Sequence, residues 1–348
     1  MARKYSGKKR SNKIEPSAMT LYIPTTPVGG PTPATVSYID LSQIASLMNR
    51  RFYRQGINWA VAGIKVLNVT GFIGSITVSK LPNTWVMSNA WEKGMRAWLR
   101  MNNEALDESP SVRPRFLDFK IFADHEHAVA GYAANLMPVS LGSTAAPNPV
   151  ATPGEWSSAR AVIPVAAGAV EGAVNEFEFI ATGGSFQGPG ASGLNSISLI
   201  EGYANSRGLP YPEDPNVPDD AADADDNTPE NWLAAMFNEG AAQTDEVLDI
   251  MITDNNQAPY PFENDGVNVD TMYPGGQNQL TGLEIHSTEF ITPTTVGGTT
   301  RIKGGNFPCG LMRLDITNQG EVPNNLVLEI DLVPGSHRGY LCESMTEM

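Results

Sequence analysis

Short apolar segments rich in β-branched and aromatic residues recur along the chain and constrain its fold more than any other feature. In 325–333 the apolar residues stand at every second position, as expected for a strand with one buried face. Turn residues separate the segments at irregular spacing, and the chain holds 33 Gly and 26 Pro. We predict strands over 57–67, 72–81, 116–123, 176–182, 196–203, 246–253, 280–291, 310–317 and 325–333. The turn at Thr70-Gly71 predicts that the first two pair with each other.

This pattern favours an all-β protein. Strands do not alternate regularly with helical segments, so a parallel α/β sheet is disfavoured. Eight or more antiparallel strands with long insertions fit one two-sheet sandwich of the jelly-roll type, which we place over 21–348. No apolar run is long enough to span a membrane, and the N-terminus lacks the apolar segment of a secretory signal.

One or two short helices are expected within this β-rich chain. Asp40 can cap a helix over 40–49. A second helix is predicted over 89–103, because Asn89 and Glu92 have the spacing of a capping box. Its apolar stripe consists of Trp91, Met95, Trp98 and Leu99. The safer expectation is that this stripe belongs to the core.

Residues 1–16 form a short basic arm. The arm contains one acidic residue, Glu15, and six basic ones, Arg3, Lys4, Lys8, Lys9, Arg10 and Lys13. The chain has 23 Lys and Arg against 38 Asp and Glu, so beyond the arm 17 basic residues face 37 acidic ones. We predict disorder for about the first 20 residues. A flexible cationic segment binds phosphates without base specificity, so these six side chains are the candidate nucleic-acid contacts.

Stacking on nucleic-acid bases is not expected from the sequence. Tyr5 is the lone aromatic residue of the arm, and we find no basic block interleaved with aromatic residues. The arm could also be read by nuclear import receptors.

A strongly acidic segment follows later in the chain. No Lys or Arg occurs between Arg207 and Arg301, where 18 acidic residues lie. We predict an exposed loop at about 205–230, within an acidic insertion over 205–245. Calcium at a subunit contact could be bound there by Asp219, Asp220, Asp223, Asp225 and Asp226. Thr228 stands where an EF-hand requires glycine, so a solvated loop is the favoured interpretation.

The remaining motifs favour no enzyme. His125 and His127 are expected in a loop and supply only two of the three or four ligands of a metal site. Residues 188–193 have dinucleotide-binding spacing, but a strand is predicted after them, so they indicate a turn. No nucleophile-and-base pattern stands out. Cys309 and Cys342 are the only cysteines, and we expect both to be reduced.

Several short segments occur in a recognisable order between about residues 50 and 340. They are Lys80-Leu-Pro-Asn-Thr-Trp85 with Ser88-Asn-Ala-Trp91-Glu-Lys-Gly-Met-Arg-Ala-Trp98, Phe116-Leu-Asp-Phe-Lys-Ile-Phe-Ala-Asp124 with Asn135-Leu-Met-Pro138, Phe307-Pro-Cys-Gly-Leu-Met-Arg-Leu-Asp315, and Leu332-Val-Pro-Gly-Ser-His-Arg-Gly339. Together they resemble capsid proteins of small circular single-stranded DNA viruses, the environmental circovirus-like group that encodes a replication initiator.

The resemblance implies a jelly-roll coat subunit that assembles in many copies into an icosahedral shell. Its arm would contact packaged single-stranded DNA inside the virion and direct the protein to the host nucleus for assembly. No membrane partner and no cofactor are implied, apart from the calcium considered above. The arm is shorter and poorer in arginine than those of familiar circoviruses, and RNA-virus coats share the jelly roll, so the type of nucleic acid stays open.

A second function class remains open from the residues alone. A calcium-dependent carbohydrate-binding or adhesive β-sandwich could use the loop from Asp219 to Asp226. Such a protein would be a monomer with calcium-dependent stability. It would have no use for the basic arm.

Overall fold

The protein was analysed as a computed structural model of the whole chain. The structure describes residues 17–30, 34–68, 71–114, 116–139, 150–164, 174–206, 232–236, 282–294, 298–320 and 323–348. None of the helices in these ranges combines the length and the apolar character needed to cross a bilayer.

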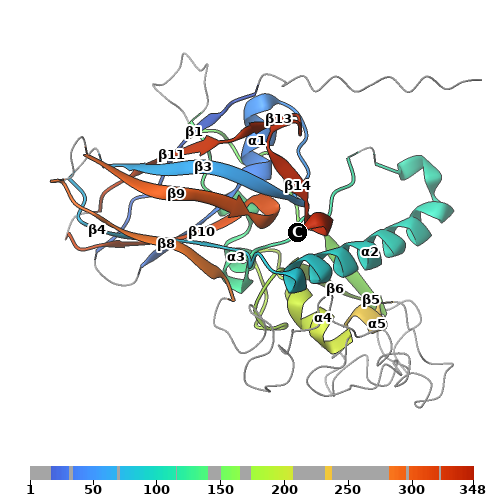
Figure 1. Cartoon of the computed structure of the whole chain (residues 1–348). Helices are drawn as coiled ribbons and strands as arrows, with labels where there is room; N and C mark the ends of the chain where they lie inside the picture. The colour runs from blue at the N-terminus through green and yellow to red at the C-terminus, as the bar shows by residue number, and fades with distance from the viewer. Residues whose placement is uncertain are drawn as a thin grey trace, which may run out of the picture.

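Two antiparallel sheets pack into a β-sandwich (Figure 1). The first has the order β1 (Thr20–Pro24), β11 (Val327–Leu332), β3 (Ile57–Leu67) and β9 (Thr299–Phe307), with the short β14 (Cys342–Ser344) also paired to β3. The second has the order β2 (Thr35–Asp40), β10 (Leu311–Asn318), β4 (Gly74–Lys80) and β8 (Glu284–Ile291). An all-β sandwich is therefore confirmed as the main architecture.

The pairing of these eight strands is nested. β4 pairs with β8, β3 with β9, β2 with β10 and β1 with β11, always antiparallel. Consecutive strands alternate between the sheets, except at β4 and β8, which are neighbours in one sheet. The sandwich is therefore one long antiparallel hairpin, folded over so that its strands enter the two sheets in turn.

The inner faces of both sheets share one hydrophobic core. Ile64 and Ile330 contribute from the first sheet, and Ile76 and Leu314 from the second. The predicted alternation of β11 is confirmed, because Leu328, Ile330 and Leu332 are buried while the residues between them are partly exposed. Burying each such side chain contributes on the order of 1.5–3 kcal/mol.

A large insertion between β4 and β8 forms a second structural layer beside the sandwich (Figure 1). It contains a three-stranded sheet and most of the helices: α2 (Trp85–Glu108), α3 (His125–Ala130), β5 (Arg160–Pro164), β6 (Val174–Ile180), β7 (Asn195–Ser198), α4 (Leu199–Ser206) and α5 (Trp232–Ala235). β6 pairs with β5 antiparallel and with β7 parallel.

The insertion packs around a second core, which contains a cluster of aromatic residues. Trp91 and Trp98 of α2 pack against Phe119, which in turn packs against Phe179 of β6. A glycine is needed at position 202 of α4, because a Cβ there would lie 2.1 Å from the indole nitrogen of Trp232. The apolar stripe predicted for α2 therefore does face a core, but the core belongs to the insertion.

Both predicted helices exist. α1 (Leu41–Asn49) is capped by Asp40, whose carboxylate accepts hydrogen bonds from the backbone of Ser42 and Gln43. The predicted cap of the second helix is wrong: α2 begins at Trp85, and Thr84 caps it by accepting from the Met87 N–H at 3.3 Å. Asn89 lies inside this helix of 24 residues, and α3, α4 and α5 add helices that the sequence did not predict.

Several strand predictions need correction. β3 and β4 do not pair with each other but lie in opposite sheets. The segment 116–123 is not a strand, because of its residues only Phe122 makes a bridge, to Ile180. The chain over 196–203 leaves the strand after Ser198 and continues as α4. In each case packing against a distant segment, rather than local propensity, decides the outcome.

Other predictions have mixed outcomes. The predicted strand at 246–253 lies outside the described residues. The predicted turn at 188–193 is present and leads into β7. Both cysteines are free, as expected.

Trp98→Ala tests the insertion core. Trp98 is 6% exposed and contacts Phe119, so its removal should lower the free energy of unfolding by roughly 3–5 kcal/mol. Urea denaturation monitored by circular dichroism measures this. The matched control on the same helix is Arg96→Ala, whose side chain is 74% exposed and should cost little. Equal effects of the two changes would contradict the packing described here.

Candidate nucleic-acid interface

The residues predicted to bind nucleic acid or metal lie outside the described part of the chain. This holds for the six basic residues of the arm and for the five aspartates of the acidic loop. The structure does describe where the arm joins the body. The backbone N–H of Ala18 donates to Asn49 Oδ1 at 2.9 Å, and the Tyr340 hydroxyl donates to the Ala18 carbonyl at 2.7 Å. The first described residues after the arm therefore lie beside the C-terminal end of α1.

A basic segment follows directly at that end of α1. Arg50 closes the helix in the left-handed conformation, with φ of 52°, and Arg50, Arg51 and Arg54 are exposed. Tyr53 is buried between them, where its N–H donates to Ser46 Oγ and its hydroxyl to the Arg338 carbonyl. Since Tyr53 is anchored, the arginines on either side of it point away from the core.

Three aromatic rings lie against this basic segment. The ring centroid of Phe52 is 5.3 Å from that of Phe116 and 6.1 Å from that of Trp156. The Lys120 ammonium lies 4.7 Å from the Trp156 ring centroid and 5.7 Å from that of Phe52. Arg54 lies 5.7 Å from the Phe52 ring centroid. The body thus carries cations interleaved with aromatic rings, at the end where the arm begins.

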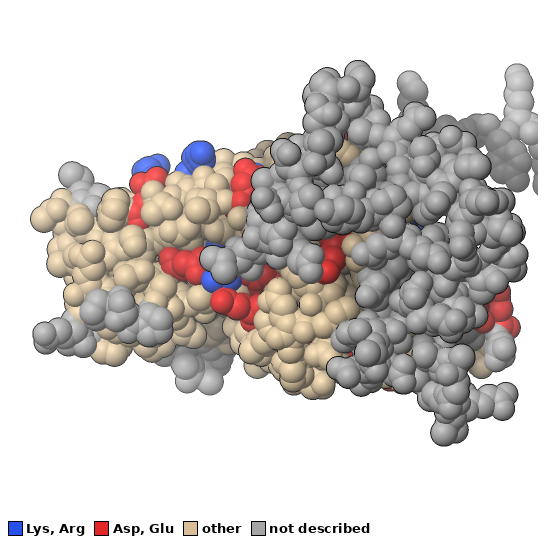
Figure 2. Space-filling view, turned by 90° about the horizontal axis from the view of Figure 1, so that it is seen from below, with Lys and Arg blue, Asp and Glu red and all other residues tan. Residues whose placement is uncertain are grey.

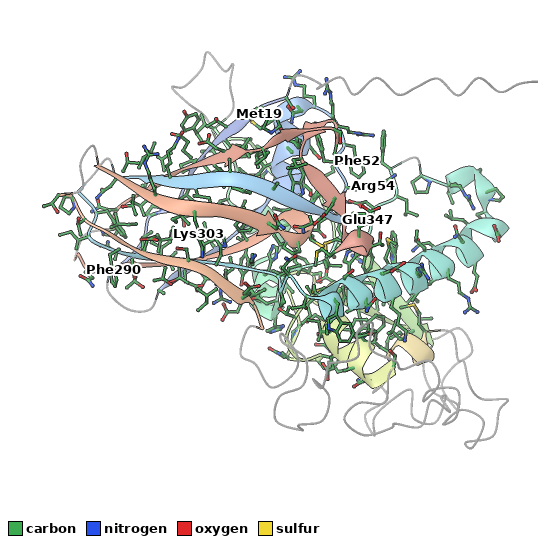
Figure 3. The ribbon with its side chains drawn as sticks, in the orientation of Figure 1. Met19, Phe52, Arg54, Phe290, Lys303 and Glu347 are labelled. Atoms are coloured by element: carbon green, nitrogen blue, oxygen red, sulfur yellow. The ribbon has the colours of Figure 1, made fainter. Side chains whose placement is uncertain are left out.

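Figure 3 makes this placement visible, because Met19, Phe52 and Arg54 all lie toward the same end of the sandwich. Phe290 lies at the opposite end. The face seen in Figure 2, turned away from α1, carries mostly acidic groups among the charged residues of its described surface. The positive groups of the α1 end therefore contrast with an otherwise acidic body.

The sequence analysis missed this surface. Arg50-Arg-Phe-Tyr-Arg54 is a basic block interleaved with aromatic residues, so the statement that the chain holds no such block is wrong. The pattern was readable from the sequence alone. Its association with Phe116, Lys120 and Trp156 was not, because those residues come from the insertion.

A buried ion-pair network joins the insertion to the sandwich. Arg313 of β10 is 7% exposed and its Nη1 lies 2.8 Å from Asp124 Oδ2. The Tyr38 hydroxyl of β2 donates to Asp124 Oδ1 at 2.7 Å, and Asp315 and Glu126 also pair with the guanidinium. The buried Arg313 and Asp124 compensate each other's charge, so the network holds α3 against the second sheet, while the Glu126 carboxylate stays partly exposed.

His127 lies within the same network as a neutral residue. Its Nδ1 accepts from the Ala123 N–H at 3.0 Å, so Nε2 carries the proton and donates to Asn135 Oδ1 at 2.9 Å. Burial lowers the pKa of His127 to about 4. His125 and His127 lie on a helix rather than in the predicted loop, and the described residues contain no group of three possible metal ligands.

Asp40 connects α1 to the aromatic rings. Its buried carboxylate accepts from the Trp156 indole N–H at 3.0 Å and from Gln55 Nε2 at 3.1 Å, in addition to capping α1. Burial raises the pKa of Asp40 to about 6, and the hydrogen bonds from Gln43, Gln55, Ser42 and Trp156 limit this increase. Burial also raises the pKa of Asp118, which lies near Lys120 and Arg54. Asp40 is fully buried and positions the interface, whereas Asp118 is partly exposed.

Comparisons of the chain with protein-family models, curated proteins and solved structures gave no match. The functional assignment therefore depends on the sequence and the geometry described above.

Acidification tests the role of His127. The pKa of His127 is lowered in the folded state, so the unfolded chain binds more protons in this range. The contribution of His127 to the free energy of unfolding is therefore lost as the pH falls from about 6.5 to 4. This amounts to about 3 kcal/mol. The raised pKa of Asp40 acts in the opposite direction, adding stability as the pH falls through about 6.

The measurement is urea denaturation of the protein and of His127→Asn at four pH values between 4.5 and 7.5. Asn keeps an acceptor for the Ala123 N–H, so the variant should lose stability at pH 7 but show less loss on acidification. His286→Asn, at a partly exposed position, is the control and should follow the unmodified protein. Parallel curves for all three proteins would refute the assignment of a neutral, buried His127.

Proposed function

We propose that this chain is a viral coat protein built on a jelly roll. The support for the jelly roll is the nested pairing of eight strands into sheets of order β1-β11-β3-β9 and β2-β10-β4-β8. A jelly roll has eight antiparallel strands in two sheets, connected by Greek keys. The insertion between β4 and β8 then corresponds to an enlarged loop between the fourth and fifth strands of the roll.

The observation that carries the functional proposal is the place where the basic arm joins the body. Ala18, two residues after the arm, lies beside the end of α1 where Arg50, Arg51 and Arg54 are exposed. The exposed arginines of the body thus lie where the basic arm joins it, on a protein that is otherwise acidic. An acidic surface elsewhere would not compete for phosphates, so the basic end is suited to face packaged nucleic acid.

The proposed partners are other copies of this chain and single-stranded nucleic acid. Many copies would form a closed icosahedral shell with the arms inside, and binding would be independent of base sequence. The protein would reside in the virion, and in the host nucleus during assembly. We propose no catalytic role, since the buried titratable groups described above serve one another as partners.

The test is to express the full chain, image it by electron microscopy and measure nuclease-protected nucleic acid. Closed uniform shells with protected nucleic acid are the expected result. Deleting residues 1–16 should leave shells that are empty, and a variant with Lys8, Lys9, Arg10 and Lys13 changed to Gln should behave similarly while keeping the length of the arm. Removing six cations should reduce the slope of log affinity against log salt by about 4 for single strands.

Two outcomes would contradict this proposal. Unchanged nucleic-acid content after the deletion would remove the role of the arm. A monomer whose melting temperature falls on chelation would instead favour the calcium-binding sandwich.

A further inference from the structure

A groove of about 380 Å³ lies between the end of α1 and the insertion. Arg50, Arg51 and Phe52 line one side, and Phe116 and Trp156 line the other. Glu155 is the one carboxylate among its described lining residues. Phe116 is 55% exposed, so part of its ring is accessible to a ligand in the groove.

We propose that this groove binds single-stranded nucleic acid, with an unpaired base stacked on Phe116 and the adjoining phosphates held by Arg50 and Arg51. The inference deepens the proposed function and rests on it for the identity of the ligand. It adds a binding site on the folded body and specifies unpaired bases as the feature recognised.

The chemistry of the groove favours a single strand over a duplex. Aromatic side chains bind bases through their faces, and in a duplex those faces are already stacked on neighbouring base pairs. Arginine provides both charge for phosphates and a planar group that stacks on bases. A surface built for duplex backbone alone would need the cations but not an exposed ring beside them.

The rings that support Phe116 are held in place. The Trp156 indole N–H donates to the buried carboxylate of Asp40, and the Phe52 carbonyl accepts from the Arg338 guanidinium. Lys120 lies over the rings of both Phe52 and Trp156. Phe116 therefore leans on a rigid, positively charged platform, which lowers the entropic cost of ordering a base against it.

The groove also lies close to the point where the arm joins the body. Ala18 is hydrogen-bonded to Asn49. The residue that follows Asn49 is Arg50, which lines the groove. The place where the arm joins the body therefore lies next to the groove.

Phe116→Ala tests this proposal in the full-length chain. Binding of fluorescent 20-nucleotide oligo(dT) and of a duplex of equal length is measured by anisotropy at several salt concentrations. Loss of one stacked base should weaken single-strand binding roughly tenfold and leave duplex binding and the salt slope unchanged. Phe116→Trp should restore the affinity.

Phe290→Ala is the matched control. Phe290 is 73% exposed and lies at the opposite end of the sandwich (Figure 3), so its removal should leave both affinities unchanged. Arg50→Gln combined with Arg51→Gln should lower the salt slope for single strands by about 1.4. A lower salt slope in this double variant, with an unchanged slope in Phe116→Ala, would distinguish the phosphate contacts from the stacking contact.

Several outcomes would overturn the inference. Single-strand affinity of Phe116→Ala equal to that of the unmodified protein would exclude stacking on this ring, and equal losses for single strand and duplex would exclude selectivity for unpaired bases. If Phe116→Ala impairs self-association, as measured by sedimentation, but leaves nucleic-acid binding intact, the groove would be reassigned to a contact with the acidic body of another copy. A protein that forms no shells but shows Phe116-dependent single-strand binding would refute the coat function while supporting the groove.

Discussion

The buried carboxylate of Asp40 is the interaction on which the candidate interface depends. Asp40 ends β2, caps α1 and accepts hydrogen bonds from Gln55 and Trp156, so it links the sandwich, the first helix and the insertion. Removing such a charge from water is costly, as its raised pKa indicates, and four hydrogen-bond donors offset that cost. The position of α1 fixes the exposed arginines, and the position of Trp156 fixes the aromatic platform.

A second buried network serves a related purpose farther along the same boundary. Arg313 and Asp124 come from the sandwich and the insertion respectively, and each satisfies a charge that would be unfavourable alone. A buried ion pair adds little net stability, but removing one partner leaves the other charge unpaired. The network therefore specifies one arrangement of two hydrophobic cores that apolar packing alone would define less sharply.

The charge distribution gives these structural links a functional consequence. Most charged groups of the body are acidic, whereas the end that carries Ala18 and the C-terminus of α1 is rich in arginine. Long-range repulsion would keep a polyanion away from the acidic surfaces and direct it to that end. The nested sandwich supplies the rigid frame, and the insertion supplies the residues that complete the groove.

The sequence by itself determined the strands whose apolar residues alternate, such as β11, the cap of α1 by Asp40 and the charge contrast between arm and body. These features follow from local periodicity, from a short-range hydrogen bond and from composition. Only the tertiary structure decided that β3 and β4 lie in opposite sheets, and that Phe116 and Trp156 join Arg50 and Arg51. The physical reason is that each of these depends on contacts between residues far apart in the chain, which local propensity does not encode.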